Sequence, residues 1–191
     1  MKSLKGTRTE QNLLKAFAGE AQASTRYRFF ASVARREGYE QIAGVFAETS
    51  DQEKEHAERF FKFLEGGPVE ITGTYPAGRI GKTAENLAAA AEGELEEWGV
   101  LYPDFAETAA AEGFPDVADA FRHIANVEQE HERRYRILLE RVKCGEVFTR
   151  EEPIRWQCRN CGYVHTGKEA PDVCPACRHA KAYFEPMKDN Y

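Results

Sequence analysis

Residues 46–60 read FAETSDQEKEHAERF, and residues 121–135 read FRHIANVEQEHERRY. In both stretches apolar residues recur at three- and four-residue steps, the spacing that gathers side chains on one face of a helix. Each apolar face contains a Glu-x-x-His pair near its middle, so a carboxylate and an imidazole lie one turn apart on that face. The pairs are Glu53 with His56 and Glu128 with His131. Both stretches therefore predict buried helices that carry metal-ligand chemistry in their interior.

The helical period extends over four long segments. We expect helices at residues 9–37, 39–65, 81–112 and 115–144. Glycine and proline mark the turns between them, at Gly38, at residues 66–68 and at Gly113 with Pro115. A bundle helix of ~26 residues is ~40 Å long, and an extended chain over residues 66–80 reaches ~50 Å. The second connection can thus cross the whole bundle, as in ferritin-like folds.

An internal repeat relates the two halves of this helical region. Tyr27 recurs as Tyr102, an offset of 75 residues that the two Glu-x-x-His pairs share. Gly19-Glu20 recurs as Gly93-Glu94 after only 74 residues. The slip predicts one extra residue in the third helix between Glu94 and Tyr102. A π-bulge would accommodate it, and such bulges are frequent at functional sites.

The apolar faces of the first and third helices are also interrupted by acid, at Glu20 and Glu94. A buried carboxylate costs several kcal/mol even after relaxation, against a total stability of about 5–15 kcal/mol. A single Glu-x-x-His pair in a charged helix, taken alone, is better read as two ordinary surface residues. Di-iron carboxylate bundles, however, use one Glu from each of two helices and Glu-x-x-His from each of the other two. The complete set matches that pattern, so we expect a two-iron site.

Glu97 adds a fifth carboxylate, one turn beyond Glu94. It is either a rim residue facing solvent or a ligand that favours ferric iron, in which case it competes with His56 for one iron. Tyr27 and Tyr102 lie one or two turns from Glu20 and Glu94 in sequence. They are either core filler or hydrogen-bond partners of the carboxylate ligands. Five phenylalanines are expected in the core: Phe29, Phe30, Phe60, Phe61 and Phe63.

The composition changes after Gly145, and four of the five cysteines lie near the C-terminus. They form two Cys-x-x-Cys pairs, Cys158 with Cys161 and Cys174 with Cys177. Four thiolates suit tetrahedral zinc or iron, and the spacing alone does not choose between them. A di-iron site upstream favours iron, because a redox site needs an electron source. We expect a bundle domain over 1–146, a linker at 147–152 and a metal-bound domain over 153–191.

Net charge and hydropathy exclude several partners. The chain carries a net charge of −6, which argues against nucleic acid, since phosphate binding relies on clustered Lys and Arg. No apolar run approaches the ~20 residues of a membrane span, and the N-terminus lacks the apolar stretch of a secretory signal. We therefore expect a cytoplasmic protein without a membrane partner. Cys144, His123, His165 and His179 are expected to be structural or surface residues.

Across essentially its full length the chain resembles the rubrerythrins, an all-α ferritin-like four-helix bundle followed by a small rubredoxin-like β/loop domain. The resemblance rests on Glu20, the two Glu-x-x-His pairs, Glu94-x-x-Glu97, Cys158-x-x-Cys161-Gly162-Tyr163 and Cys174-Pro175-Ala176-Cys177. Two departures concern the second domain. The gap between its cysteine pairs is shorter than in free-standing rubredoxins, and Arg178 with His179 replaces the usual glycine.

The resemblance implies reduction of hydrogen peroxide to water by a di-iron centre, as an oxidative-stress defence. Glu53 and Glu128 would bridge the irons. Glu20 and Glu97 would be terminal on one iron, with Glu94 and His131 on the other. His56 would replace Glu97 on reduction. Electrons would come from NAD(P)H through a reductase and a carrier such as a rubredoxin, entering at an iron held by Cys158, Cys161, Cys174 and Cys177. A head-to-tail homodimer is also implied.

Three functions compete at this stage. The first is the peroxidase, which the tethered four-cysteine centre and Glu97 favour. The second is a ferroxidase or iron-handling protein that uses oxygen in the same bundle, although iron storage needs no dedicated source of electrons. The third is a zinc-ribbon interaction protein on a helical scaffold, which buried glutamates disfavour.

Overall fold

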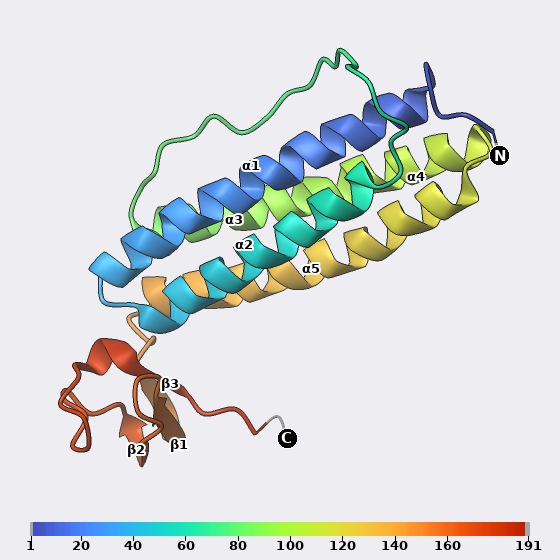
Figure 1. Cartoon of the computed structure of the whole chain (residues 1–191). Coiled ribbons are helices and arrows are strands. Elements are labelled where there is room, and N and C mark those ends of the chain that lie inside the picture. The colour runs from blue at the N-terminus through green and yellow to red at the C-terminus, as the bar shows by residue number, and fades with distance from the viewer. Residues whose placement is uncertain (1, 190–191) are drawn as a thin grey trace.

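The computed structural model describes residues 2–189. Helices and strands follow the chain in this order: α1 Arg8–Arg36, α2 Glu40–Phe61, α3 Thr83–Glu96, the π-helix η1 Glu97–Leu101, α4 Tyr102–Ala111, α5 Pro115–Lys143, β1 Thr149–Cys158, β2 Val164–Glu169, the 3₁₀ turn η2 Lys181–Tyr183, and β3 Phe184–Pro186. The helices form an elongated bundle, and the strands form a small module at one end of it (Figure 1). No helix of the described residues is both long and apolar enough to cross a membrane.

The helix ends follow local chemistry. Thr7 caps α1 by accepting a hydrogen bond from the backbone N–H of Glu10 at 3.1 Å. Gly38 takes a positive φ of 85° after the end of α1, which is the usual glycine position there. The expectation that the second helix runs to residue 65 was wrong, because α2 ends at Phe61. Glu65 instead accepts hydrogen bonds from the hydroxyl of Ser3 and the N–H of Leu4, which hold it outside the helix.

The connection over residues 66–80, called the strap below, has no regular secondary structure. Figure 1 shows it running beside α1 from one end of the bundle to the other, so that α3 starts near the end of α1. The long crossover is therefore confirmed. It makes α1 with α2 one hairpin, and α3, η1 and α4 with α5 the other.

The third long helix contains the predicted extra residue. Residues Glu97–Leu101 form a π-helix between α3 and α4, in the interval where the repeat slips by one residue. The backbone N–H of Tyr102 bonds to the carbonyl of Glu97, the i→i+5 spacing of a π turn. This wider turn begins at Glu97 and therefore sets the position of the fifth carboxylate.

Two apolar clusters fill the bundle, with a polar layer between them. One surrounds Phe46 and Tyr135, and the other surrounds Phe60 and Phe121. On each helix the acidic residue of the apolar face lies between the two clusters. The expectation that Phe29 and Phe61 belong to the core was wrong, since their side chains are 47% and 56% exposed.

The C-terminal module, residues 149–189, is a three-stranded antiparallel sheet in the order β2-β1-β3. Trp156, Phe184, Cys158 and Cys174 are buried together in a core of its own. β1 begins at Thr149, inside the stretch expected to be a linker, and the domain boundaries remain a prediction. Near the junction Tyr39 stacks on Phe148, with ring centroids 6.2 Å apart.

Candidate metal centres

The polar layer of the bundle brings six of the expected ligands together. Two overlapping groups each have their ligand atoms within 4.8 Å of one another. One group is Glu20, Glu53, His56 and Glu128, and the other is Glu53, Glu94, Glu128 and His131. We call these six residues the di-metal site. All of them are buried except His56, which is half-buried.

Two carboxylates are shared by both groups, and their oxygens divide between the two imidazoles. Glu53 turns Oε2 to Nδ1 of His56 at 3.0 Å and Oε1 to Nδ1 of His131 at 3.1 Å. Glu128 does the same with Oε1 at 2.9 Å and Oε2 at 2.8 Å. Each shared carboxylate thus faces two positions at once. Each of these two carboxylates could therefore contact both ions of a candidate di-metal site.

Much of this layer lacks hydrogen-bond partners among the described residues. The unpartnered atoms are Glu20 Oε2, Glu53 Oε1, Glu94 Oε2, both oxygens of Glu128, and His131 Nδ1. Ligands about 2.1 Å from a metal and at right angles to each other lie about 3 Å apart, which matches the imidazole-to-carboxylate distances. Buried oxygens this close need a cation to offset their charge. The donor set fits a di-metal site.

Electrostatics support the same conclusion. Burial, followed by the charges of Glu128 and Glu53, raises the pKa of Glu20 well above its usual value. Burial and the same two charges raise the pKa of Glu94. Burial lowers the pKa of His56, but the nearby carboxylates of Glu128 and Glu53 outweigh this and raise that pKa to about 10. Without metal, protonated groups must therefore supply the missing positive charge.

Two tyrosines contact Glu94 and Glu20, the carboxylates that each belong to only one of the two groups. The hydroxyl of Tyr27 donates to Oε1 of Glu94 at 2.5 Å, and the hydroxyl of Tyr102 donates to Oε1 of Glu20 at 2.5 Å. Each tyrosine therefore contacts the carboxylate of the opposite repeat rather than that of its own.

Gln52 is the residue near the site that the sequence analysis missed. Its Oε1 lies 2.9 Å from Nε2 of His131, so it can accept that N–H and leave Nδ1 free toward the site. The repeat offers no signal for it, because the neighbouring positions differ between the two halves as well: residues 47–52 read AETSDQ and residues 122–127 read RHIANV.

Glu97 does not join either group of close ligand atoms. It is half-buried on η1, and burial together with the charges of Glu128 and Glu53 raises its pKa well above the usual value. Its Oε1 lies 3.7 Å from the position that a Cβ would occupy at Gly19. In this structure His56 lies in the group with Glu20, and Glu97 lies outside it.

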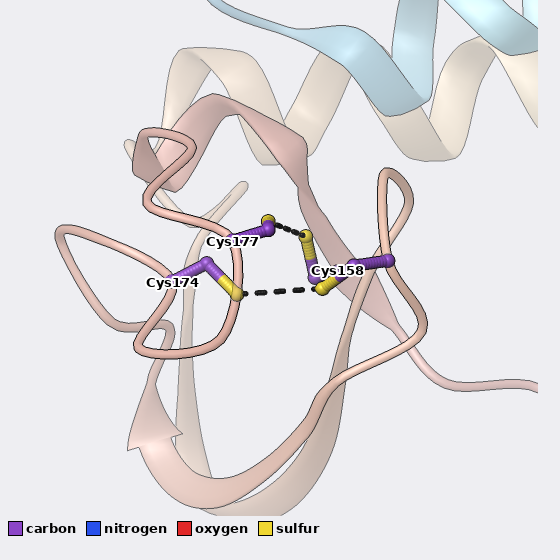
Figure 2. A group of neighbouring side chains, drawn as sticks. Cys158, Cys174 and Cys177 are labelled. Atoms are coloured by element: carbon purple, nitrogen blue, oxygen red, sulfur yellow. Dashed lines mark hydrogen bonds between the residues drawn. The ribbon is translucent and has the colours of Figure 1, made fainter.

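The four cysteines of the C-terminal module gather at one point (Figure 2). The sulfurs of Cys158 and Cys177 are 3.8 Å apart, and those of Cys161 and Cys174 are 3.6 Å apart. A tetrahedron with metal–sulfur bonds of 2.3 Å has edges of about 3.8 Å. The donors thus fit a four-coordinate metal site.

The two cysteine loops end in a left-handed residue. Gly162 has φ 79°, and Arg178 has φ 65°, which makes it the one non-glycine residue with positive φ in the described part of the chain. Arg178, which replaces the glycine usual in rubredoxin-like domains, therefore has a strained backbone conformation. The backbone N–H of His179 nearby donates to the Cys177 sulfur and lowers the pKa of that thiol to about 6.

Comparison with known proteins decides the family. A model described as rubrerythrin matches residues 11–139, and one described as the rubrerythrin rubredoxin-like domain matches residues 156–185. The chain belongs to the rubrerythrin family. It is 68% identical to a rubrerythrin of Porphyromonas gingivalis over 190 residues, which is 100% of this chain and 95% of that one. It is 52% identical to a rubrerythrin of Nitratidesulfovibrio vulgaris over the full length of both.

Solved structures agree with the fold of this rubrerythrin-family chain. Fully reduced, all-ferrous nigerythrin is similar to it with a TM-score of 0.63 and 29% identity, over 97% of this chain and 92% of that one. The expected ferritin-like bundle with a rubredoxin-like domain is therefore confirmed. The family suggests a di-iron oxidoreductase with one candidate di-metal site and one four-cysteine metal site.

Proposed function

We propose that this chain is a non-haem di-iron peroxidase that reduces hydrogen peroxide to water. One observation carries the proposal: Glu53 and Glu128 each divide their two oxygens between His56 and His131. The same chain carries a four-cysteine site, which supports the proposal that one chain holds both a two-ion redox site and a one-electron site. The 68% identity to a rubrerythrin supports it.

Specific residues would hold the two irons. Glu53 and Glu128 would bridge them, with Glu20 on the ion beside His56, and Glu94 and His131 on the other. When bound, the irons supply the two electrons that peroxide reduction requires. Tyr27 and Tyr102 keep Glu94 and Glu20 oriented through their hydroxyls. Apolar clusters on both sides limit access of water to this layer.

Glu97 and His56 would exchange with the redox state. His56 already faces Glu20, Glu53 and Glu128, and we propose that this arrangement corresponds to the reduced site. Glu97 would replace His56 on oxidation, because an added carboxylate offsets the charge gained by the ions. With their raised pKa values, Glu97, Tyr27 and Tyr102 are also the groups near the site suited to holding protons at neutral pH.

Electrons would enter at an iron bound by Cys158, Cys161, Cys174 and Cys177. The proposed donors are a rubredoxin and its NAD(P)H reductase, with the chain as the terminal component of a peroxidase system. A head-to-tail homodimer is proposed to bring the four-cysteine iron of one chain near the di-metal site of its partner. We place this system in the cytoplasm as a defence against oxidative stress.

Stopped-flow mixing of the fully reduced protein with peroxide or with oxygen tests the proposal. The visible bands of the four-cysteine iron report its oxidation. We expect oxidation to be much faster with peroxide. Faster oxidation with oxygen, together with turnover of free ferrous iron, would support the ferroxidase instead.

A matched pair of variants tests the electron path. Cys161→Ser removes one sulfur of the four-cysteine site, whereas Cys144→Ser removes an exposed thiol outside it. We expect steady-state peroxide reduction to fall in the first variant only. A single turnover of the chemically reduced bundle should survive in both. Equal steady-state rates in both variants would remove the module from the electron path.

A further inference from the structure

A cavity of about 370 Å³ lies between α1, the strap and the π-helix. Its inner wall includes Glu97 and Tyr102, and Tyr102 donates to Glu20 of the di-metal site. Its outer wall is the strap segment 72–76. The cavity therefore reaches from the surface covered by the strap to residues at the edge of the di-metal site.

Gly19 of α1 provides the space where these walls meet. A Cβ at this position would lie 3.7 Å from Oε1 of Glu97 and 4.0 Å from Cε1 of Tyr75. Alanine would fit without a clash, and glycine is a poor residue for a helix interior. Helix geometry thus does not explain the glycine. The open space between Glu97 and the Tyr75 ring explains the small residue at position 19, because any longer side chain would enter this space.

Tyr75 closes the cavity from the strap. Its ring folds back over Gly73, where a Cβ would come within 2.7–2.9 Å of the ring and its hydroxyl. The hydroxyl lies 3.3 Å from the backbone carbonyl of Lys15 on α1, to which it donates. The ring is thereby held across the mouth of the cavity without being part of the bundle core.

The lining combines free polar atoms with apolar walls. Oε1 of Gln22 and Nε of Arg26 are buried, and no hydrogen-bond partner for either lies within residues 2–189. Ala16, Leu101 and Phe105 supply apolar surface. Pockets for small molecules typically occupy 300–1,000 Å³, whereas a water molecule occupies about 30 Å³. Hydrogen peroxide, which is little larger than water, would leave most of this cavity unfilled.

We propose that this cavity binds the oxidant and admits small organic hydroperoxides as well as hydrogen peroxide. The inference rests on the proposed peroxidase function and extends its substrate class. The terminal O–H donates to Gln22, Arg26 donates to a peroxide oxygen, and the alkyl group lies on the apolar wall. The O–O bond breaks as two electrons from the reduced di-metal site and two protons are taken up, which yields an alcohol and water.

Ligand density is a test that does not depend on turnover. Crystals of the protein with zinc in the di-metal site are soaked with tert-butyl hydroperoxide, because zinc keeps the charge of the reduced site and has no electrons to donate. We expect density in the wild-type cavity within hydrogen-bond distance of Gln22 or Arg26. In Gly19→Leu the cavity should be empty. An empty wild-type cavity, or a ligand bound only elsewhere, overturns the inference.

Stopped-flow oxidation of the reduced protein separates this inference from the proposed function. We expect tert-butyl hydroperoxide to oxidise the wild type, and Gly19→Leu to slow that reaction about tenfold more than the reaction with hydrogen peroxide. Ala21→Leu, at an exposed position on the same helix, should change neither rate. Tyr75→Ala opens the mouth and should speed the reaction with the bulkier cumene hydroperoxide.

Each kinetic outcome has a distinct meaning. Oxidation by hydrogen peroxide but not by tert-butyl hydroperoxide overturns the inference and leaves the proposed function in place. Equal slowing of both oxidants in Gly19→Leu, with no gain in Tyr75→Ala, also overturns it. Oxidation by neither reagent overturns both.

Discussion

The hydroxyl of Tyr27 on α1 donates a hydrogen bond to Oε1 of Glu94 on α3, so a side chain from one half of the repeat orients a carboxylate from the other. Tyr102 and Glu20 make the reciprocal contact. The two hairpins are therefore joined through the residues that surround the di-metal site, and the geometry of the site depends on how the hairpins pack.

Removal of one such contact should weaken metal binding. Tyr27→Phe leaves Oε1 of Glu94 without this donor, and losses of this kind typically reduce metal affinity about 10–100-fold. Competition with a chelator measures the affinity of each ion. Tyr39→Phe, which alters a tyrosine stacked on Phe148 at the end of the bundle, serves as the control. Unchanged affinity in Tyr27→Phe would show that the contact does not position Glu94.

Gln52 should distinguish the two metal positions. Because Gln52 contacts only His131 of the two imidazoles, Gln52→Leu should lower affinity for the ion beside His131 and Glu94 by about 10–100-fold. The repeat-equivalent residue, Val127, offers no polar atom, so Val127→Leu should have little effect on either ion. Stepwise metal release into a chelator measures both. Equal weakening of the two ions by Gln52→Leu would contradict a specific role on His131.

The metal-free protein should lose stability as the pH rises. Although burial lowers both values, the nearby carboxylates of Glu128 and Glu53 raise the pKa of His56 from 6.5 to about 10 and that of His131 to about 9. The two imidazoles contribute fully to the free energy of unfolding below pH 6.5, their pKa in the unfolded chain. That contribution is lost as the pH rises through 9 to 10. The raised pKa values of Glu20 and Glu94 also make the folded protein less stable as the pH rises, beginning at about pH 4.5.

Thermal unfolding of the chelator-treated protein between pH 6 and 10 measures this effect. The melting temperature should fall steadily across that range. With metal bound, the ions replace the protons, so the fall should be much smaller. A metal-free melting temperature that stays level up to pH 10 would contradict the proposed protonation of the two imidazoles.

Arg178 should be replaceable with a gain in stability. A non-glycine residue in the left-handed region costs roughly 1–2 kcal/mol, and Arg178 has φ 65°. Arg178→Gly should therefore stabilise the C-terminal module by about 1 kcal/mol, less the added flexibility of the unfolded chain. Ala176→Gly in the same loop is the control and should not stabilise. Denaturant unfolding followed by Trp156 fluorescence measures both, and a destabilised Arg178→Gly would show that the arginine side chain contributes a contact.

Much of the architecture was predictable from the sequence because it depends on short-range spacing. The Glu-x-x-His pairs on apolar faces predicted the buried layer, and the one-residue slip between Glu94 and Tyr102 predicted the π-helix. Both signals act within a few helical turns, where periodicity is strict.

The features that the sequence did not predict depend on how distant segments meet. The partner of Tyr27 is Glu94 rather than Glu20, because packing between hairpins decides which carboxylate its hydroxyl reaches. Glu65, expected in the second helix, instead accepts hydrogen bonds from Ser3 and Leu4, far away in the chain. Phe61 lies outside the core although its neighbour Phe60 is buried, because adjacent helical side chains point about 100° apart and packing with the other helices decides which of the two faces inward.

The proposed function requires two irons in the bundle and one iron on the four cysteines. Anomalous diffraction from crystals of the purified protein, recorded at the iron and zinc absorption edges, tests it directly. We predict two iron peaks bridged by Glu53 and Glu128, and a third among the four cysteine sulfurs. A single metal in the bundle, or zinc on the cysteines, would contradict this assignment of three irons.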